Sequence, residues 1–183
     1  MSEKVFVTAK SFPDSNALKK QTRESQLQRV CRGVYAHPGN FEPLLAYALA
    51  HPQAIVTLQS ALVVYGFSDA FPLPPFDLAF KNGSRNQKDP SIRQFYISSV
   101  LFDLGKTTYK WMGGSLTIYD RERLLIELFR FEKRLDRQTF KDAIFAYREL
   151  VRKGDFSTAV YQSYIEHFPN SKNLWRRFEN EIT

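Results

Sequence analysis

The sequence predicts an α+β protein, in which a shortened winged helix-turn-helix precedes a small mixed or antiparallel sheet and a C-terminal helical cluster. Three observations predict this class. Residues 14–36 have the pattern of a basic helix, a tight turn and a hairpin. Residues 76–119 alternate apolar and polar side chains, and apolar residues recur at helical spacing from residue 120 onward. Strands followed by a run of helices are typical of segregated layers. We expect two domains, spanning 1–39 and 40–183.

The first predicted helix begins at Asp14 or Ser15, whose short side chains can accept hydrogen bonds from the free N–H groups of a first helical turn. At 3.6 residues per turn, one face of this helix holds Leu18, Thr22 and Ser25. The opposite face is polar and mostly cationic, and it holds Asn16, Lys19, Lys20 and Arg23. Such a face is typical of a helix that enters the major groove of DNA.

A hairpin is predicted to follow this helix, with short strands over 27–30 and 33–36. Cys31 and Arg32 lie between the strands, and Gly33 can adopt the positive φ that a tight turn needs. Arg29 and Arg32 would then brace the DNA phosphates. The N-terminal module would therefore present both a reading helix and a basic hairpin.

The remaining elements follow from apolar spacing and from residues that begin or end helices. Residues 4–9 predict a strand or an extended arm, and residues 55–57 a short extended segment. Helices are predicted over 43–51 and 58–65, strands over 76–80, 93–98, 107–112 and 115–119, and further helices over 120–133, 138–152, 156–167 and 172–182. Thr57 and Asp120 can cap two helices, and Gly154 can stop a third. Four residues of the helix over 138–152 are expected to face inward, namely Phe140, Ile144, Phe145 and Leu150.

Positive charge is concentrated near the N-terminus. Residues 1–40 carry seven Lys and Arg against three Asp and Glu, a net +4 of the chain's +7, which leaves +3 for the other 143 residues. A local basic excess on a helix and a hairpin indicates contact with a polyanion, although an ordinary solvated face would account for it equally well. No apolar run has the length of a signal peptide or of a membrane span, so we expect a soluble cytoplasmic protein without a membrane partner.

Candidate catalytic and metal-binding residues are few. The single cysteine, Cys31, excludes an internal disulfide. Its neighbours Arg29 and Arg32 could lower the pKa of its thiol, but a turn residue is the favoured interpretation. The histidines lie far apart in the sequence and are interpreted as surface, cap or packing residues; they are His37, His51 and His167. We predict no catalytic residue, no metal site and no cofactor.

One acidic pair and one single carboxylate are candidates for a nuclease or nucleotidyltransferase site. Asp120 and Glu122 could hold Mg²⁺, but the favoured interpretation is a helix cap with salt bridges to neighbouring arginines, Arg121 and Arg123. Asp77 lies on a predicted strand, but a PD…(D/E)xK nuclease needs an acidic residue where this chain has Ala79.

Three segments together resemble the AbiEi family of antitoxins and transcriptional repressors from bacterial type IV toxin–antitoxin, or abortive infection, systems. The segments are LQRVCRGVYAHP (27–38), HPQAIVTLQSALVVYGF (51–67) and LTIYDRERLLIELFRF (116–131). The second is similar to the family's small-residue helix at Ser60, Ala61, Leu62 and Gly66. The third matches a family pattern at Glu122 and Arg123, and departs from its Thr and Asp at Leu125 and Glu127.

The resemblance implies a partial winged-helix DNA-binding module over 1–39 and an α/β antitoxin-like domain over 40–183. It implies a non-enzymatic autorepressor that binds operator DNA as inverted repeats, with self-association on the DNA possible, and opposes a nucleotidyltransferase-like toxin. It assigns Asn16, Lys19, Lys20 and Arg23 to the groove-facing helix, and Arg29 and Arg32 to the wing. Two other functions stay open: an antitoxin-like interaction module without DNA binding, and a metal-dependent nuclease or nucleotidyltransferase.

Overall fold

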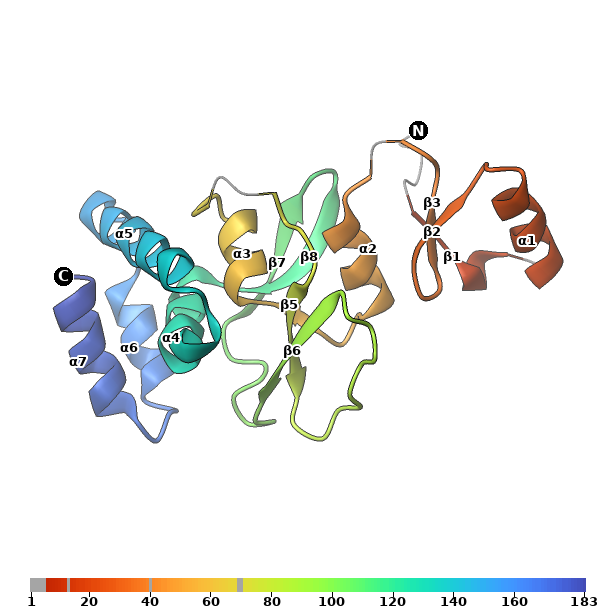
Figure 1. Ribbon diagram of the computed structural model, residues 1–183. Coiled ribbons are helices and arrows are strands. Elements are labelled where there is room, and N and C mark those ends of the chain that lie inside the picture. The colour runs from red at the N-terminus through yellow and green to blue at the C-terminus, as the bar shows by residue number, and fades with distance from the viewer. Residues whose placement is uncertain (1–5, 13, 40, 69–70) are drawn as a thin grey trace.

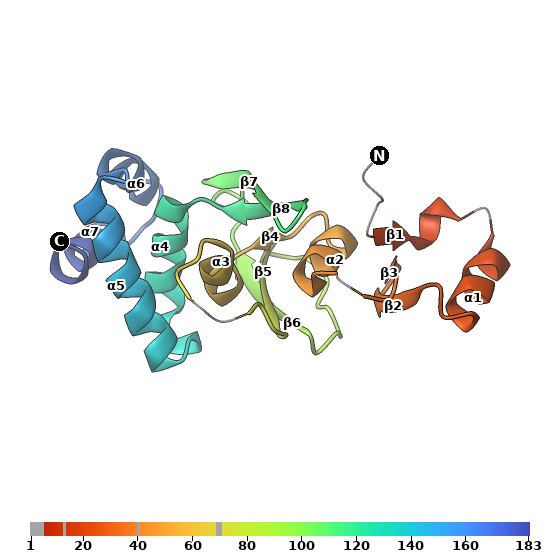
Figure 2. The same ribbon diagram turned by 90° about the horizontal axis from the view of Figure 1, so that it is seen from above.

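The computed structural model describes residues 6–12, 14–39, 41–68 and 71–183. Its elements lie in three groups along one direction (Figures 1 and 2). A small sheet and α1 occupy one end, a larger sheet with α2 and α3 occupies the middle, and helices α4 to α7 occupy the other end. The predicted α+β class with a C-terminal helical cluster is confirmed.

The N-terminal group contains a three-stranded antiparallel sheet in the order β1-β3-β2. Its elements are β1 (Phe6–Thr8), the 3₁₀ turn η1 (Ala9–Ser11), α1 (Ser15–Arg23), β2 (Gln28–Cys31) and β3 (Val34–Ala36). The strand expected over 4–9 is present at 6–8, and residues 4 and 5 lie outside the described residues. The predicted hairpin is confirmed, but its turn is Arg32-Gly33. Cys31 belongs to β2, because a register shift between Arg29 and Cys31 pairs it with Val34. Gly33 has the predicted positive φ, +79°.

Of the three residues predicted to share one face of α1, only Leu18 is buried. Leu18 is buried, but Thr22 is exposed and turns its hydroxyl back to donate to the Leu18 carbonyl at 2.8 Å. Ser25 lies beyond the end of the helix, at φ +58°. The half-buried neighbours of Leu18 are Ala17 and Gln21. The buried stripe is thus narrow, and most of α1 faces solvent.

The middle group is a five-stranded mixed sheet in the order β6-β5-β4-β8-β7. Its strands are β4 (Ile55–Val56), β5 (Phe76–Lys81), β6 (Ile92–Ile97), β7 (Lys106–Trp111) and β8 (Gly114–Tyr119). The pairs β5/β6 and β4/β8 are parallel, whereas β4/β5 and β7/β8 are antiparallel. The two residues of β4 lie at the centre of the sheet and are fully buried, which explains why this short segment is entirely apolar.

Two helices, α2 (Pro43–Ala50) and α3 (Leu58–Val64), join the sheet to its surroundings. Helix α2 contacts β2 and β3 on one side and β8 on the other. At its contact with β8, a Cβ atom on Gly114 would lie 2.8 Å from a methyl group of Leu45, so this close approach requires glycine. Thr57 stands at the start of α3 as predicted, but its buried hydroxyl makes no cap hydrogen bond among the described residues.

The C-terminal helices are α4 (Arg121–Phe131), the 3₁₀ turn η2 (Glu132–Arg134), α5 (Arg137–Lys153), α6 (Thr158–Ile165) and α7 (Ser171–Glu181). Asp120 caps α4 as predicted, by accepting a hydrogen bond from the Arg123 N–H. Gly154 ends α5 in the left-handed conformation, also as predicted. The expected inward face of α5 is wrong at Phe145, which is 65% exposed. Ile144 is buried as predicted, together with Ala143 and Tyr147, whereas Phe140 and Leu150 are half-buried.

A single apolar cluster extends from the hairpin to the C-terminal helices. It includes Cys31 and Val34 of the hairpin, the inner residues of α2 and both faces of the sheet, and it ends at Phe178 and Ile182. Leu18 and Leu27 are buried outside this cluster. The small sheet is therefore packed onto the rest of the chain through α2. Among the described residues, no helix is long and apolar enough to cross a membrane.

Candidate nucleic-acid interface

Helix α1 is fixed at its start by Asp14. The carboxylate accepts hydrogen bonds from the N–H groups of Asn16 and Ala17, at 2.6 and 2.7 Å, which satisfies two of the free donors of the first turn. Lys20 and Arg23 lie in the last turn, where positive charge complements the helix dipole. The cap and the buried Leu18 together set which face of the helix meets solvent.

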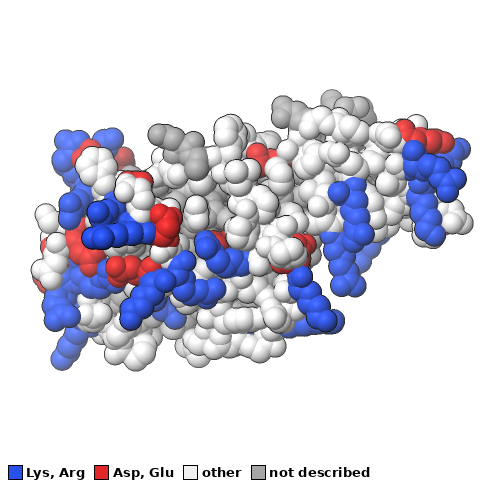
Figure 3. All heavy atoms as spheres, in the orientation of Figure 1, with Lys and Arg blue, Asp and Glu red and all other residues white. Residues whose placement is uncertain are grey.

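The six residues predicted to contact DNA all lie exposed, and they are Asn16, Lys19, Lys20, Arg23, Arg29 and Arg32. The four on α1 are spaced i, i+3, i+4 and i+7, so they form one continuous stripe. Figure 3 shows Lys and Arg side chains over α1 and over the hairpin on the same visible face. Within the described part of the chain, none of the six pairs with an acidic side chain. Arg29 only donates to the Cys31 carbonyl, at 3.4 Å.

Cys31 is buried under the hairpin rather than activated. Its thiol contacts the Ala46 carbonyl of α2 at 3.6 Å. Burial raises the pKa of the Cys31 thiol to about 11; the charge of Asp89 adds to the rise and Arg29 opposes it. The alternative of a thiol pKa lowered by arginines is therefore wrong, because desolvation outweighs the nearby Arg29. Cys31 has a packing role.

The candidate metal pair, Asp120 and Glu122, is engaged in holding helices together. Besides capping α4, Asp120 accepts a hydrogen bond from the Tyr164 hydroxyl at 2.7 Å. Glu122 accepts one from the Ser157 N–H at 2.8 Å, across to the start of α6. Burial raises the pKa of Asp120, and the hydrogen bonds oppose that rise. No cluster of three or more metal-ligating side chains occurs within the residues that the structure describes.

Within the described residues, neither Arg121 nor Arg123 forms the expected salt bridge with Asp120 or Glu122, because both arginines contact other groups. Arg121 lies over the ring of Tyr65, 5.5 Å from its centroid. Arg123 is fully buried, donates through Nε to Glu127 at 2.8 Å and donates to the carbonyls of Leu101 and Leu104.

A second arginine completes this buried network, which sequence reasoning missed. Arg130 donates to both oxygens of Glu127, at 2.7 and 2.9 Å. The second terminal nitrogen of Arg123 lies 2.7 Å from Glu127 Oε1 without hydrogen-bond alignment, so the pair is held mainly through Nε. The sequence did carry a signal for this network. Arg123 and Glu127 are oppositely charged at i and i+4, and the three residues between them are all apolar, which is unusual on a solvated helix face.

Asp77, the other candidate catalytic carboxylate, is also engaged in hydrogen bonds within the fold. It is buried on β5 and accepts two hydrogen bonds from Arg93, at 2.6 and 2.8 Å, and one from the Gln59 N–H at the start of α3. Burial raises the pKa of Asp77, and Arg93 opposes the rise. The pair thus ties β5, β6 and α3 together.

The histidines fit their predicted roles. His37 shares a hydrogen bond with the Gln26 carbonyl at 3.0 Å, His51 packs edge-on against Phe80 at the end of α2, and His167 is exposed.

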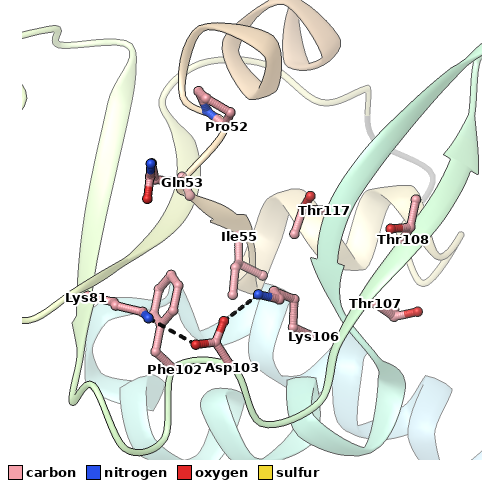
Figure 4. Close-up of a pocket in the computed structure, with 11 residues that line it drawn as sticks. Pro52, Gln53, Ile55, Lys81, Phe102, Asp103, Lys106, Thr107, Thr108 and Thr117 are labelled. Atoms are coloured by element: carbon pink, nitrogen blue, oxygen red, sulfur yellow. Dashed lines mark hydrogen bonds and ion pairs between the residues drawn. The ribbon is translucent and has the colours of Figure 1, made fainter.

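A cavity of about 300 Å³ opens between residues 52–55, strands β7 and β8, and the segment after β6. Figure 4 shows Lys81 and Lys106 both directed at Asp103 in its wall. The hydrogen bond from Lys106, followed by that from Lys81, holds the pKa of Asp103 below its ordinary value. Threonine side chains line the other wall. The carboxylate already neutralises one of the two cations, so this cavity is a weaker anion site than the stripe on α1.

Comparison with known proteins supports the fold. The chain is similar to the RV2827C protein of Mycobacterium tuberculosis, whose crystal structure matches it with a TM-score of 0.67 over 99% of this chain and 72% of that one. The two sequences are 15% identical, so the likeness shows the fold alone. No family model and no curated protein matches the sequence.

Proposed function

We propose that this chain is a non-enzymatic, DNA-binding autorepressor and antitoxin of a bacterial type IV toxin–antitoxin system, acting in the cytoplasm. One observation carries the DNA-binding part of the proposal. The exposed stripe of α1 places three cations and one amide along a single helix face, and no acidic side chain within the described residues neutralises it. Held by its cap and by Leu18, the stripe is available to a polyanion.

The arrangement around α1 supports a winged-helix mode of binding. A helix followed directly by a hairpin can enter the major groove while the hairpin contacts the flanking phosphates. On α1, Lys19 and Lys20 would neutralise phosphates, and Asn16 and Arg23 have the side chains that read adenine and guanine edges. Arg29 and Arg32 would serve as the wing.

The antitoxin part of the proposal rests on the resemblance of the three sequence segments. The α/β domain over 40–183 would oppose a nucleotidyltransferase-like toxin, and self-association on inverted repeats would give repression of the operon. Two features of the fold are compatible with such a domain, namely its α+β class and its C-terminal helices.

The decisive test is a mobility-shift titration with the DNA upstream of the protein's own gene, at low salt. The triple variant Lys19→Ala, Lys20→Ala, Arg23→Ala should abolish the shift. A matched control removes one arginine and two lysines at the other end of the molecule, by Lys133→Ala, Arg137→Ala and Lys141→Ala; all three are exposed. The control should bind like the unmutated protein. If the unmutated protein gives no shift at low salt, the DNA-binding proposal is wrong.

A protein-interaction module without DNA binding is the second candidate function. It is favoured by two exposed apolar side chains, Phe71 and Leu73, each 74% exposed on the segment before β5. Co-purification with the product of the adjacent gene, in the absence of any DNA shift, would establish it. A metal-dependent nuclease gains no support, because Asp120 and Glu122 are engaged in helix contacts; metal-dependent activity lost on Glu122→Ala would revive it.

A further inference from the structure

The loop between β5 and β6, residues 82–91, carries two more exposed cations, Arg85 and Lys88. Neither side chain has a hydrogen-bond or ion-pair partner within the described residues. The two residues are separated from the basic module by some fifty positions, so the charge pattern of the sequence does not connect them with it. Nothing in the site described above includes them.

The loop has a fixed shape because its own polar groups hold it. The Gln87 N–H donates to the Gln94 side chain at 2.6 Å, and Gln94 in turn donates to the Arg85 carbonyl. At the far end, Asp89 accepts a hydrogen bond from the Ser91 N–H at 2.9 Å. Arg85 and Lys88 therefore project from an ordered backbone, which lowers the entropy lost when their side chains bind.

This loop lies beside the hairpin. In Figures 1 and 2 the loop bulges from the larger sheet past α2, toward the β2–β3 hairpin. The electrostatics agree: the charges of Asp89 and Arg29 both act on the Cys31 thiol, which belongs to β2. In Figure 3, Lys and Arg side chains follow one another along the lower edge, over α1, then the hairpin, then the loop.

We propose that the loop over 82–91 is a second DNA-backbone contact, in which Arg85 and Lys88 bind phosphates of the duplex beyond those that α1 and the hairpin contact. This inference rests on the proposed DNA binding by α1. A duplex is the occupant that fits, because the three groups of cations follow one another along one edge and a row of phosphates can meet them in succession. The domain over 40–183 would thus take part directly in holding the operator.

The test compares the Arg85→Ala, Lys88→Ala double variant with the unmutated protein on the same upstream DNA, over a series of salt concentrations. Each phosphate contact changes the slope of log K against log[salt] by about 0.9, so losing two should reduce the slope by about 1.8. At about 0.1 M salt the affinity should fall at least about tenfold. The ratio of affinities for upstream and scrambled DNA should stay constant, because phosphate contacts carry no base information.

Two further variants make the result specific. Arg137→Ala with Lys141→Ala removes an equal charge from α5 and should leave the slope unchanged. Asp89→Asn keeps the acceptor for the Ser91 N–H but removes a negative charge beside the proposed phosphates, so it should tighten binding. If the loop had only a structural role, Asp89→Asn would not tighten DNA binding.

The outcomes separate the two proposals. If the unmutated protein binds but the Arg85, Lys88 variant keeps its affinity and salt slope, the second contact is wrong and the role of α1 stands. An equal loss in the α5 control would also overturn it, because the effect would then follow net charge alone. If the unmutated protein gives no shift, the proposed function itself fails.

Discussion

Arg123 and Glu127 form a buried ion pair one helical turn apart on α4, and neither side chain is more than 1% exposed. Arg123 also lies against the rings of Tyr119 and Phe168, which close the site on both sides. Glu127 is the shared acceptor of Arg123 and Arg130, so the network depends on its single negative charge.

Replacing Glu127 with Gln should destabilise the fold by about 3–5 kcal/mol, because it leaves the charge of Arg123 buried without compensation. Urea unfolding followed by circular dichroism measures this. Glu149→Gln, which breaks an exposed pair with Arg152, serves as the control and should barely move the midpoint. Equal effects of the two substitutions would show that the buried network is not what holds α4 in place.

His51 should make the protein less stable on mild acidification. Burial lowers the pKa of His51 in the folded chain below its ordinary value of 6.5, and the charge of Asp89 only partly opposes this. Below about pH 6.5 the unfolded chain therefore takes up this proton before the folded chain does, and stability falls as the pH drops toward the lowered folded pKa.

The measurement is the urea midpoint at pH 7 and at pH 5. His51→Gln should lose less stability between the two pH values than the unmutated protein. The exposed His167 provides a matched control, and His167→Gln should keep the full pH dependence. An unchanged pH dependence in His51→Gln would count against the assignment.

Cys31 should resist alkylation in the native state. A thiol with a pKa near 11 holds little thiolate at pH 8, so its reaction with iodoacetamide should be roughly a hundredfold or more slower than that of a free cysteine. Because the chain has one cysteine, mass spectrometry reports this site alone. The reaction should accelerate only when the hairpin opens away from α2; reaction at the free-thiol rate in folded protein would contradict the packing.

The cap at Asp14 should control DNA binding through the order of α1. Asp14→Ala removes the acceptor of two N–H groups and should destabilise α1 by about 1 kcal/mol. If DNA binding has to restore the order of α1 at that cost, the affinity for DNA should fall about fivefold. Asp14→Asn is equally uncharged but retains an acceptor, so it should bind more tightly than Asp14→Ala. Equal DNA binding by the two variants would show that the helix cap does not contribute to DNA binding.

Local rules predicted much of this fold because the responsible interactions are local. Asp14 and Asp120 cap helices that begin beside them, and Gly33 and Gly154 take the positive φ that their turns require. The exposed stripe of α1 follows from the helical period alone. These features depend on residues within four positions of one another.

What the sequence did not predict depends on partners far along the chain. The Cys31 pKa is set by α2, which buries the thiol, and not by the adjacent arginines. Phe145 is exposed because α5 buries only a narrow stripe, and this stripe passes through Tyr147 instead. The Arg123 network needs carbonyls some twenty residues earlier, and the charge of Asp89 in the loop over 82–91 acts on Cys31 of the hairpin although the two are far apart in the sequence. The spacing of residues within a single helix or strand cannot predict these contacts with residues far away in the sequence.

Cys31 and Val34 share their core with the larger sheet, so the described residues of the hairpin are packed against the rest of the chain. A duplex bound to α1 would therefore set the orientation of the C-terminal helices relative to the DNA axis. Two copies on an inverted repeat would hold their helical ends at an angle set by the spacer. Inserting half a helical turn of DNA between the half-sites should move the C-terminal helices of one copy to the opposite side of the duplex. Any contact between the C-terminal helices of the two copies should then be lost.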